Sequence, residues 1–353
     1  MDAKIEARVS DVLRRVAPGT DLREALDSII SADSGALIVI GDVERVRSLC
    51  DGGFALGVPF TPQRLFELAK MDGAILLDEE CGTIIRANVH LVPDASLPTA
   101  ETGMRHRTAE RVSRQTSALV VSVSQRRNIV SLYRAGRRIT VEDVTVVLAK
   151  ANQALQTLQR YRIRLDEVMA RLTVLEFEDA VTMGDVVLAL QRSELVKRVA
   201  REVARYVDQL GSEGRLVAMQ AEEVIANVAE EHALLLRDYL VAPGVRQTTA
   251  ARTALSDMNQ DKILDDVAVA AVLGFPTSAD SLEHHVRSRG YRVLRRIPSL
   301  PASVINRLVD RFAGLVALAR ATEEQLDEVD GVGARRASAI ADGLRRLRGS
   351  AAV

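Results

Sequence analysis

Three side chains that can carry positive charge follow a glycine in one short segment of this 353-residue chain. The segment begins at Gly103 and continues through Met104, Arg105, His106, Arg107 and Thr108. Glycine lets the backbone approach a phosphate, arginine offers a planar fork to its oxygens, and the free N–H groups of a helix start favour an anion. The pattern predicts a phosphate site at the start of a helix. A basic helix start without a ligand is the alternative.

A single carboxylate, Asp72, precedes Gly73 and an apolar run at 74–77, some way before the basic segment. An Asp-Gly pair at the start of a strand is often only a turn. Beside phosphates, however, one carboxylate is what Mg²⁺ or Mn²⁺ needs to complete its set of oxygen ligands. The two motifs together predict a nucleotide phosphate site with Asp72 as the metal ligand, and they suit either cation.

A third polar group, Ser124 with Arg127, comes just after an apolar run at 118–122. Ligands in open α/β sheets collect where strands end, so both side chains could reach the same phosphates. The alternative is a basic hairpin turn without a ligand.

Short apolar runs, most of them rich in β-branched residues, predict the strands that must position these groups. They lie at 36–40, 74–77, 83–89, 118–122 and 129–133, with a hairpin turn at 78–82. Helical patterns separate them near 63–70 and 108–115, and a break at Pro18-Gly19 divides a helical start in which Thr20 can be a cap. The N-terminal part is therefore predicted to be a mixed α/β domain.

Apolar residues spaced three and four apart predict a long helix that packs against other helices. They are Val144, Leu148, Ala151, Leu155, Leu158, Leu165, Met169 and Leu172, with Arg162 as an interruption. Thr140 with Asp143 resembles a capping box at the start of this helix. The pattern stays helical to about Arg252, apart from breaks at 211–214 and 243–244. The middle of the chain is predicted to be an all-α spacer without chemistry of its own.

The last part of the chain is basic. Residues 286–353 contain thirteen arginines, no lysine and seven acidic residues, a net charge of +6 within a chain of net charge −1. Gly331, Val332 and Gly333 form a tight turn before a helix with Arg335 and Arg336, which is typical of a helix-hairpin-helix unit, and 297–301 resembles a degenerate copy of it. Such a turn binds DNA phosphates without base-specific contacts, so DNA binding should be independent of sequence and sensitive to salt. A solvated arginine-rich surface is the alternative.

The composition is typical of a globular chain, with 47% hydrophobic and 27% charged residues. There is no run of eighteen apolar residues and no signal segment, and Cys50 and Cys81 form neither a zinc nor a disulfide pattern. These features predict a cytoplasmic protein of two or three domains with no membrane partner.

Five motifs resemble, in order and over essentially the whole chain, those of the DisA family of bacterial DNA integrity scanning proteins, which are diadenylate cyclases. They are Asp72-Gly73-Ala74, Arg105-His106-Arg107-Thr108, the stretches 122–127 and 175–179, and Gly331-Val332-Gly333. The resemblance implies a nucleotide-binding cyclase domain at 1–139, a helical linker at 140–287 and a helix-hairpin-helix DNA-binding domain at 288–353.

The resemblance also implies the activity: two ATP molecules condense to cyclic di-AMP and two pyrophosphates, coupled to binding of branched or damaged DNA. Asp72, Arg105 and His106 are implied to be catalytic, and Asp72 would bind the metal and help activate the ribose 3′-hydroxyl. The residues implied to bind nucleotide are Gly73, Leu91, Gly103, Met104, Arg105, His106, Arg107, Thr108, Ser124 and Arg127. Those implied to bind DNA are Gly331, Val332, Gly333, Arg335 and Arg336. A homo-octamer associated with the bacterial nucleoid is implied as well.

The chain has one copy of each nucleotide motif, whereas the implied product has two-fold symmetry. Two protomers must therefore face each other, so that each 3′-oxygen attacks the α-phosphorus of the other nucleotide in line. Met104 departs from the family, in which threonine usually precedes the Arg-His-Arg run. The exchange keeps a backbone N–H and removes a hydroxyl. Two alternatives stay open: a DNA-binding scaffold that binds ATP or cyclic di-AMP without efficient catalysis, and an adenylyltransferase with another acceptor.

Overall fold

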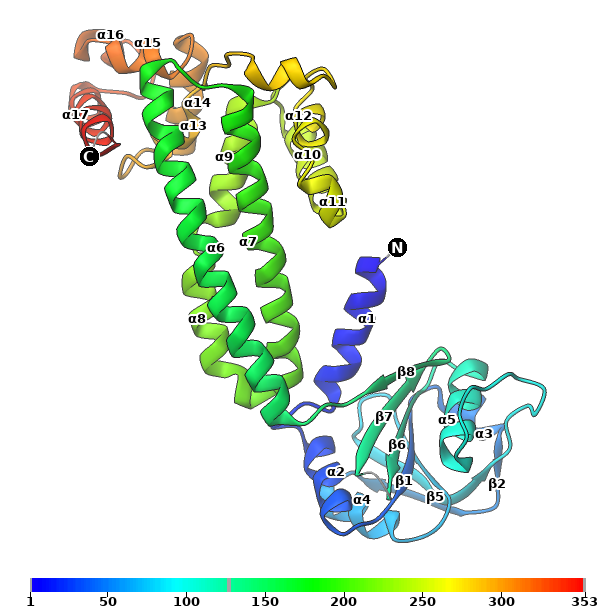
Figure 1. The fold of residues 1–353 in the computed structure, drawn as a ribbon. Helices are drawn as coiled ribbons and strands as arrows, with labels where there is room; N and C mark the ends of the chain where they lie inside the picture. Colours follow the sequence, from blue (N-terminus) through cyan, green and yellow to red (C-terminus); the bar gives the residue numbers. More distant parts are fainter. Residues whose placement is uncertain (1, 126–127, 352–353) are drawn as a thin grey trace. The chain divides into compact units, whose positions relative to one another are not determined.

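A computed structural model describes residues 2–125 and 128–351. The chain divides into two compact units (Figure 1). The first comprises Met1–Gln153 and Val203–Met219, and the second comprises Ala154–Glu202 and Gln220–Val353.

A mixed β-sheet forms the centre of the first unit, in the order β2-β5-β4-β1-β6-β7-β8. Its strands are β1 (Ala36–Ile40), β2 (Cys50–Asp51), β3 (Phe54–Pro59), β4 (Ala74–Leu77), β5 (Thr83–Leu91), β6 (Leu119–Ser124), β7 (Ile129–Arg134) and β8 (Arg137–Thr140). β1 and β4 are parallel, whereas β6 runs antiparallel to β1. β2 and β3 pair with successive parts of β5. The predicted mixed α/β domain is confirmed.

The five predicted strands are present as β1, β4, β5, β6 and β7, and β4 and β5 form the predicted hairpin. The strands β2, β3 and β8 were not predicted. Most of their residues are exposed. β2 and β8 contain no apolar run, whereas β3 does contain one, with Phe54 and Leu56 exposed. All three strands are held by backbone pairing with β5 or β7.

Helices cover both faces of the sheet. They are α1 (Asp2–Arg15), α2 (Asp21–Ser31), α3 (Val43–Arg47), α4 (Pro62–Ala69) and α5 (Met104–Gln115). Ile38 and Ile40 of β1 belong to a core with residues of α1, α2 and α4. Leu37 and Val39 point to the other face, into a core with α3 and α5. Because β1 is buried on both faces, its sequence is a continuous apolar run.

The predicted N-cap of α2 is confirmed, because the Thr20 hydroxyl accepts a hydrogen bond from the N–H of Arg23 at 3.2 Å. The capping box predicted at Thr140 is wrong. Thr140 is the last residue of β8 and pairs with Ser131, while Asp143 Oδ1 accepts from the N–H of Thr145 at 2.8 Å. The strand extends further than expected and takes Thr140 away from the helix start.

A helical region follows the sheet. Its helices are α6 (Val144–Glu178), α7 (Met183–Leu210), α8 (Arg215–Ile225), α9 (Val228–Tyr239), α10 (Val245–Asp257), α11 (Gln260–Ile263) and α12 (Asp266–Val272), with 3-10 turns η1 (Gly211–Gly214) and η2 (Ala279–Glu283). The predicted seam of α6 is buried from Ala151 to Leu172. Arg162 interrupts it because Nη1 donates to the carbonyls of Val224 and Ala226, where α8 ends.

The last described part of the chain is also helical, with α13 (Tyr291–Arg295), α14 (Ala302–Arg311), α15 (Leu315–Arg320), α16 (Glu323–Asp327) and the longer α17 (Ala334–Ala351). The loop before α14 and the loop before α17 each have one residue in the left-handed region, Ser299 at φ 61° and Gly331 at φ 80°. Each loop also buries an apolar residue next to it, Leu300 and Val332. These correspondences are those expected of a degenerate repeat.

A buried polar network joins three helices of the second unit. Arg292 of α13 forms an ion pair with Glu176 of α6, and the Tyr239 hydroxyl of α9 donates to Glu176 at 2.7 Å. Asp238 accepts the N–H groups of Tyr291 and Arg292 at 2.7 and 3.0 Å. Burial, with the charge of Glu176, raises the pKa of Asp238 to about 7. This network anchors α13 to α6 and α9.

Among the described residues, no helix is both long enough and apolar enough to cross a membrane.

Candidate nucleotide site and terminal hairpin

Strand order brings the predicted phosphate residues to one edge of the sheet. β1 and β4 are parallel neighbours, with Leu37 opposite Ala74, so Gly35 and Gly73 precede them at the same edge. β6 is antiparallel to β1, so its last residue, Ser124, reaches that edge as well. The site thus combines the amino ends of two strands with the carboxyl end of a third, which a purely parallel sheet would not do.

The two leading motifs come together here. Arg105 Nη2 lies 3.8 Å from Asp72 Oδ1. The Asp72 carboxylate is fully exposed, whereas Arg105 is partly covered. The guanidinium lies against the backbone of Gly35, where an added Cβ would be only 2.0 Å from Nη1. Gly35 is therefore needed for the position of Arg105, although no sequence pattern indicated it.

Gly73 turns the chain from Asp72 into β4. Its φ of 96° lies in the left-handed region, and an added Cβ would be 2.8 Å from the carbonyl carbon of Asn88 in β5. Both the conformation and the contact exclude a side chain. The Asp-Gly pair is therefore a turn that also presents a carboxylate, so the two interpretations of this motif are compatible.

The basic segment begins α5 as predicted. Gly103 is the N-cap and has no side-chain cap, and its carbonyl accepts the N–H of Arg107 at 2.9 Å. The first N–H groups of the helix can therefore face an anion. Met104 is 79% exposed and Arg107 is exposed, so both are open to a ligand, while Thr108 is half-buried.

His106 belongs to a hydrogen-bonded chain that the motif did not reveal. Its Nδ1 lies 2.9 Å from the Tyr133 hydroxyl, which donates to Glu101 Oε1 at 2.9 Å. Arg138 Nη1 donates to both oxygens of Glu101 at 3.1 and 3.3 Å. Burial and the bond to Glu101 raise the pKa of Tyr133, so the phenol keeps its proton.

Residues further along α5 hold the loop that leads to the site. Glu110 accepts the Thr99 hydroxyl at 2.7 Å and the Ala100 N–H at 3.2 Å. Burial alone would raise the pKa of Glu110, but hydrogen bonds from Arg114 and Thr99 outweigh it and lower this pKa. Arg111 donates to two loop carbonyls, at 95 and 97. The loop is thus fixed before the helix starts.

Two predicted residues lie less directly at the site. Leu91 pairs with Cys50 and its side chain is 7% exposed in the core beneath α5, so its role in an adenosine pocket stays a prediction. Ser124 is half-buried at the end of β6, and its carbonyl accepts the N–H of Asn128. Arg127 lies outside the described residues.

The described residues include no group of three His, Cys, Asp or Glu side chains that could hold a metal ion by themselves. The chain offers the single exposed carboxylate of Asp72 beside Arg105. Such a donor fits a divalent ion that keeps most of its ligands from phosphates and water.

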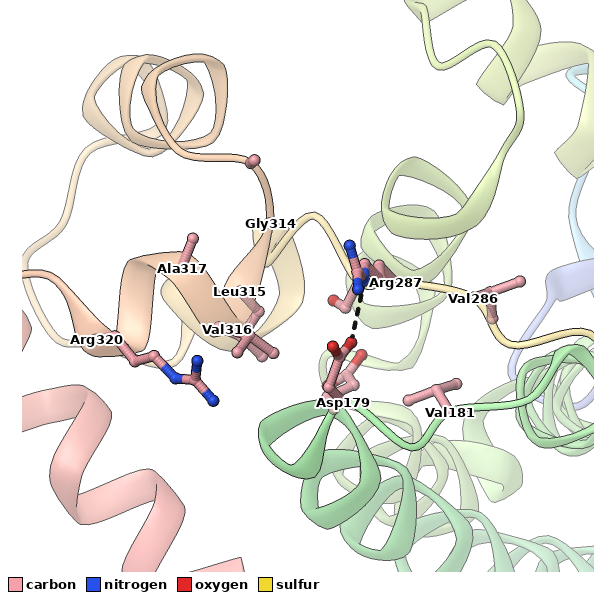
Figure 2. Close-up of a pocket in the computed structure, with 12 residues that line it drawn as sticks. Asp179, Val181, Val286, Arg287, Gly314, Leu315, Val316, Ala317 and Arg320 are labelled. Carbon is pink, nitrogen blue, oxygen red and sulfur yellow. Dashed lines mark ion pairs between the residues drawn. The ribbon is translucent and has the colours of Figure 1, made fainter.

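A cavity of about 250 Å³ lies in the second unit (Figure 2). Asp179 at its wall faces Arg287, with Arg287 Nε 3.3 Å from Asp179 Oδ1, and Glu176 is paired with Arg292. The described residues predicted to bind nucleotide do not line it. Its carboxylates are already compensated by arginines, so it offers little to a charged ligand.

The terminal hairpin connects α16 to α17. Val332 is buried and its N–H donates to the Val329 carbonyl at 2.8 Å, which closes the turn. Arg335 and Arg336 are exposed, and Arg336 Nη1 donates to the Gly331 carbonyl at 2.7 Å. Arg335 is thus exposed to solvent beside the hairpin, while Arg336 also stabilises the hairpin through its hydrogen bond to Gly331.

An arginine of α14 was missed at this hairpin. Arg307 Nη1 lies 3.2 Å from Asp330 Oδ2, and a Cβ at Gly331 would be 2.6 Å from Arg307 Nη2. The guanidinium therefore lies on the bare backbone of Gly331. No local pattern could have indicated this contact, because the two residues belong to different helical pairs.

Two family models match the chain. The nucleotide-binding model of the DisA bacterial checkpoint controller matches residues 23–138, and the linker-region model of the same controller matches residues 141–282. The mixed sheet and the helical region that follows it thus define a bacterial checkpoint-controller type of nucleotide-binding protein.

Similar full-length proteins agree with this class. The DNA integrity scanning protein DisA of Symbiobacterium thermophilum is 51% identical over 337 residues, covering 96% of this chain and 95% of its own length. The proteins of the same name from Acetivibrio thermocellus and Carboxydothermus hydrogenoformans are 46% and 47% identical, covering 99% and 97% of this chain and 96% and 97% of their own lengths. The chain belongs to the DisA family.

Proposed function

We propose that the chain is a diadenylate cyclase that condenses two ATP molecules into cyclic di-AMP and two pyrophosphates. The observation that carries this proposal is the meeting of Arg105 and Asp72 at the uncapped start of α5. A carboxylate, a guanidinium and free N–H groups at one edge suit a nucleotide triphosphate with its metal. Membership of the DisA family supports the same activity.

Each site residue has a proposed role. The segment from Gly103 to Thr108 holds the triphosphate, with Arg105 and His106 neutralising charge that develops on the phosphates. Asp72 binds the metal and helps activate the ribose 3′-hydroxyl. Gly73 and Leu91 line the adenosine pocket. Ser124 and Arg127 are proposed to act at the edge of the site, towards the facing nucleotide.

The proposed metal is Mg²⁺ or Mn²⁺, held by Asp72 together with the nucleotide phosphates. When bound, it supplies charge neutralisation at the phosphates. Catalysis by the chain itself then consists mainly of positioning, because Arg105 and the N–H groups of α5 fix the triphosphate.

We infer that two nucleotide domains face each other. One chain has one site and holds one ATP, while the product needs two nucleotides attacked reciprocally. A homo-oligomer with such facing pairs, up to the octamer implied by the family, satisfies this requirement.

The C-terminal part is proposed to be a helix-hairpin-helix domain that binds branched or damaged DNA. The positive φ of Gly331 and the exposed Arg335 support this proposal. The proposed division of the chain is a cyclase domain at 1–139, a linker at 140–287 and a DNA-binding domain at 288–353. DNA bound at the end of the chain, at the bacterial nucleoid, would change the cyclase rate.

The decisive experiment incubates the purified protein with ATP and Mg²⁺ or Mn²⁺ and resolves the nucleotides by chromatography with mass detection. Cyclic di-AMP with two equivalents of pyrophosphate is expected. Transfer of AMP to another acceptor would instead support an adenylyltransferase.

Met104 supports one rival, a DNA-binding scaffold that binds ATP or cyclic di-AMP without efficient catalysis. Its side chain is 79% exposed at the helix start, where it offers an N–H but no hydroxyl to a phosphate. If ATP binds unchanged, the scaffold is favoured, and Met104→Thr is the variant that tests whether the missing hydroxyl is the cause.

A further inference from the structure

We propose that Tyr133 and Glu101 form a positioning relay that holds the His106 ring in one tautomer and one orientation at the phosphate end of the nucleotide site. The relay extends the proposed cyclase function, on which its kinetic test rests. Its residues come from α5, from β7 and from the loop before α5, so they meet only in the folded domain.

The hydrogen positions follow from a count of donors. A phenol has one hydrogen, and a carboxylate beside Arg138 accepts only. Tyr133 donates its hydrogen to Glu101 at 2.9 Å, so its oxygen must accept from His106 at 2.9 Å. His106 therefore carries a hydrogen on Nδ1, and it can donate from Nε2 to a phosphate oxygen only as the doubly protonated imidazolium.

The other edge of the ring faces the helix start. An added Cβ at Gly103, the N-cap of α5, would be 3.4 Å from Cδ2 of His106, the carbon bonded to Nε2. With Nδ1 held by Tyr133, this edge is directed to the region where the first N–H groups of α5 meet an anion.

The relay is rigid at its centre. Tyr133 is fully buried in the core beneath α5, and burial together with Glu101 keeps its pKa raised, so the phenol stays protonated over the working pH range. Arg138 holds both oxygens of Glu101, which fixes the far end. A ring held at one end by a buried phenol keeps one rotamer, and that is what positions Nε2.

The kinetic test is Tyr133→Phe in the full chain, which removes one hydroxyl and keeps the ring. Hydrogen-bond partners that orient metal-ligating histidines typically contribute about ten- to a hundred-fold to activity, and we take the same order of magnitude for the partner of this ring. We expect kcat to fall by about ten-fold or more, with KM for ATP changed by less than about two-fold, because the phosphate contacts of Arg105 and the α5 N–H groups remain.

Ser131→Ala is the matched control. Ser131 lies two residues earlier on β7, is fully buried, and its hydroxyl has no hydrogen-bond partner among the described residues. Its removal should leave kcat unchanged. Thermal unfolding of both variants shows whether a lower rate follows from lost stability instead.

A second measurement does not depend on activity. Long-range ¹⁵N–¹H correlation spectra of histidine-labelled protein distinguish the two imidazole tautomers, and His106→Gln identifies the signals of this ring by their loss. The native protein should show His106 with its hydrogen on Nδ1, and Tyr133→Phe should show a mixture of tautomers.

The relay also predicts which ring nitrogen matters. Gln places its amide near the position of Nε2, whereas Asn places it near Nδ1. His106→Gln should therefore keep more activity than His106→Asn, and adding Tyr133→Phe to His106→Gln should lower the rate no further.

The outcomes separate the relay from the cyclase proposal. If the native protein makes no cyclic di-AMP, the proposed cyclase activity is wrong, and the tautomer spectrum of His106 still tests the relay. An active native protein whose Tyr133→Phe variant keeps its rate and its Nδ1–H tautomer overturns the relay.

Discussion

At the residue scale, the backbone dictates what the site can contain. Gly73 adopts a φ of 96° and touches the backbone of β5, and Gly35 leaves room for the Arg105 guanidinium. Neither glycine has a side chain that could bind a phosphate. Each one places a charged neighbour, Asp72 or Arg105, where the two can meet.

Gly73→Ala should destabilise the chain by about 1–3 kcal/mol, because alanine is strained at this φ and its Cβ would clash with the carbonyl carbon of Asn88. Chemical denaturation measures the change. Gly82→Ala is the control, since a Cβ there meets only Asp78 Oδ2 at 3.6 Å and should cost less than about 0.5 kcal/mol. Equal costs at both positions would contradict the argument.

Asp72→Asn should abolish cyclic di-AMP formation, because the amide no longer offers the negative charge that the metal and the 3′-hydroxyl require. The carboxylate is fully exposed, so the fold and the DNA affinity should not change. Product analysis, thermal unfolding and a DNA-binding titration check the three statements. Retained synthesis would remove Asp72 from the catalytic groups.

At the element scale, the terminal hairpin combines an exposed backbone turn with charged side chains from neighbouring helices. α16 and α17 set the turn, while Arg307 of α14 lies over Gly331 and pairs with Asp330. The hairpin is therefore built from both helical pairs of this part of the chain. Two changes of charge test how it meets DNA.

Replacing Arg335 and Arg336 by Ala should weaken DNA binding and flatten its salt dependence, by about 0.9 in the logarithmic slope for each DNA phosphate that is no longer neutralised. Basal synthesis of cyclic di-AMP should be unchanged. Titrations at several salt concentrations provide the slope. Lost synthesis in this variant would mean that the nucleotide and DNA regions are not separate.

Asp330→Asn should strengthen DNA binding, by about two- to ten-fold at low salt, because a negative charge next to the approaching phosphate is removed and Arg307 becomes available to it. Asp327→Asn makes the same change in net charge on α16 and is the control. If both variants bind DNA more tightly by the same factor, the change in net charge alone explains the effect and Arg307 does not contribute to it.

At the scale of the whole molecule, buried polar contacts decide how the chain's later helices stay together. Glu176, Asp238 and Arg292 are all fully or almost fully buried and connect α6, α9 and α13. A buried charge without its partner is costly, so each member depends on the others.

Arg292→Leu should destabilise the chain by about 3–5 kcal/mol, because it leaves Glu176 buried without its cation. Arg295→Ala on the same helix is the control: its pair with Glu230 is half-exposed and should contribute less than about 1 kcal/mol. Denaturant titration of both variants gives the comparison. A small effect at Arg292 would show that the network relaxes when it is broken.

Local signals in the sequence predicted much of the fold. Apolar runs indicated the five core strands, Thr20 was a correct cap, and period-3.6 spacing indicated the buried seam of α6. Strands β2 and β8 were missed because these short, exposed strands have no apolar run, whereas β3 was missed although it contains Phe54, Leu56 and Val58. The capping box at Thr140 failed because β8 continues to that residue.

By itself, the sequence determined the local elements and the family, because hydrophobic period, caps and motifs act over a few neighbouring residues. Only the tertiary structure decided that Asp72 meets Arg105, that Gly35 makes room for it, and that Tyr133 and Glu101 hold His106. These contacts depend on the order and direction of strands. That order results from burying two faces of one sheet at once, which no short segment of the chain encodes.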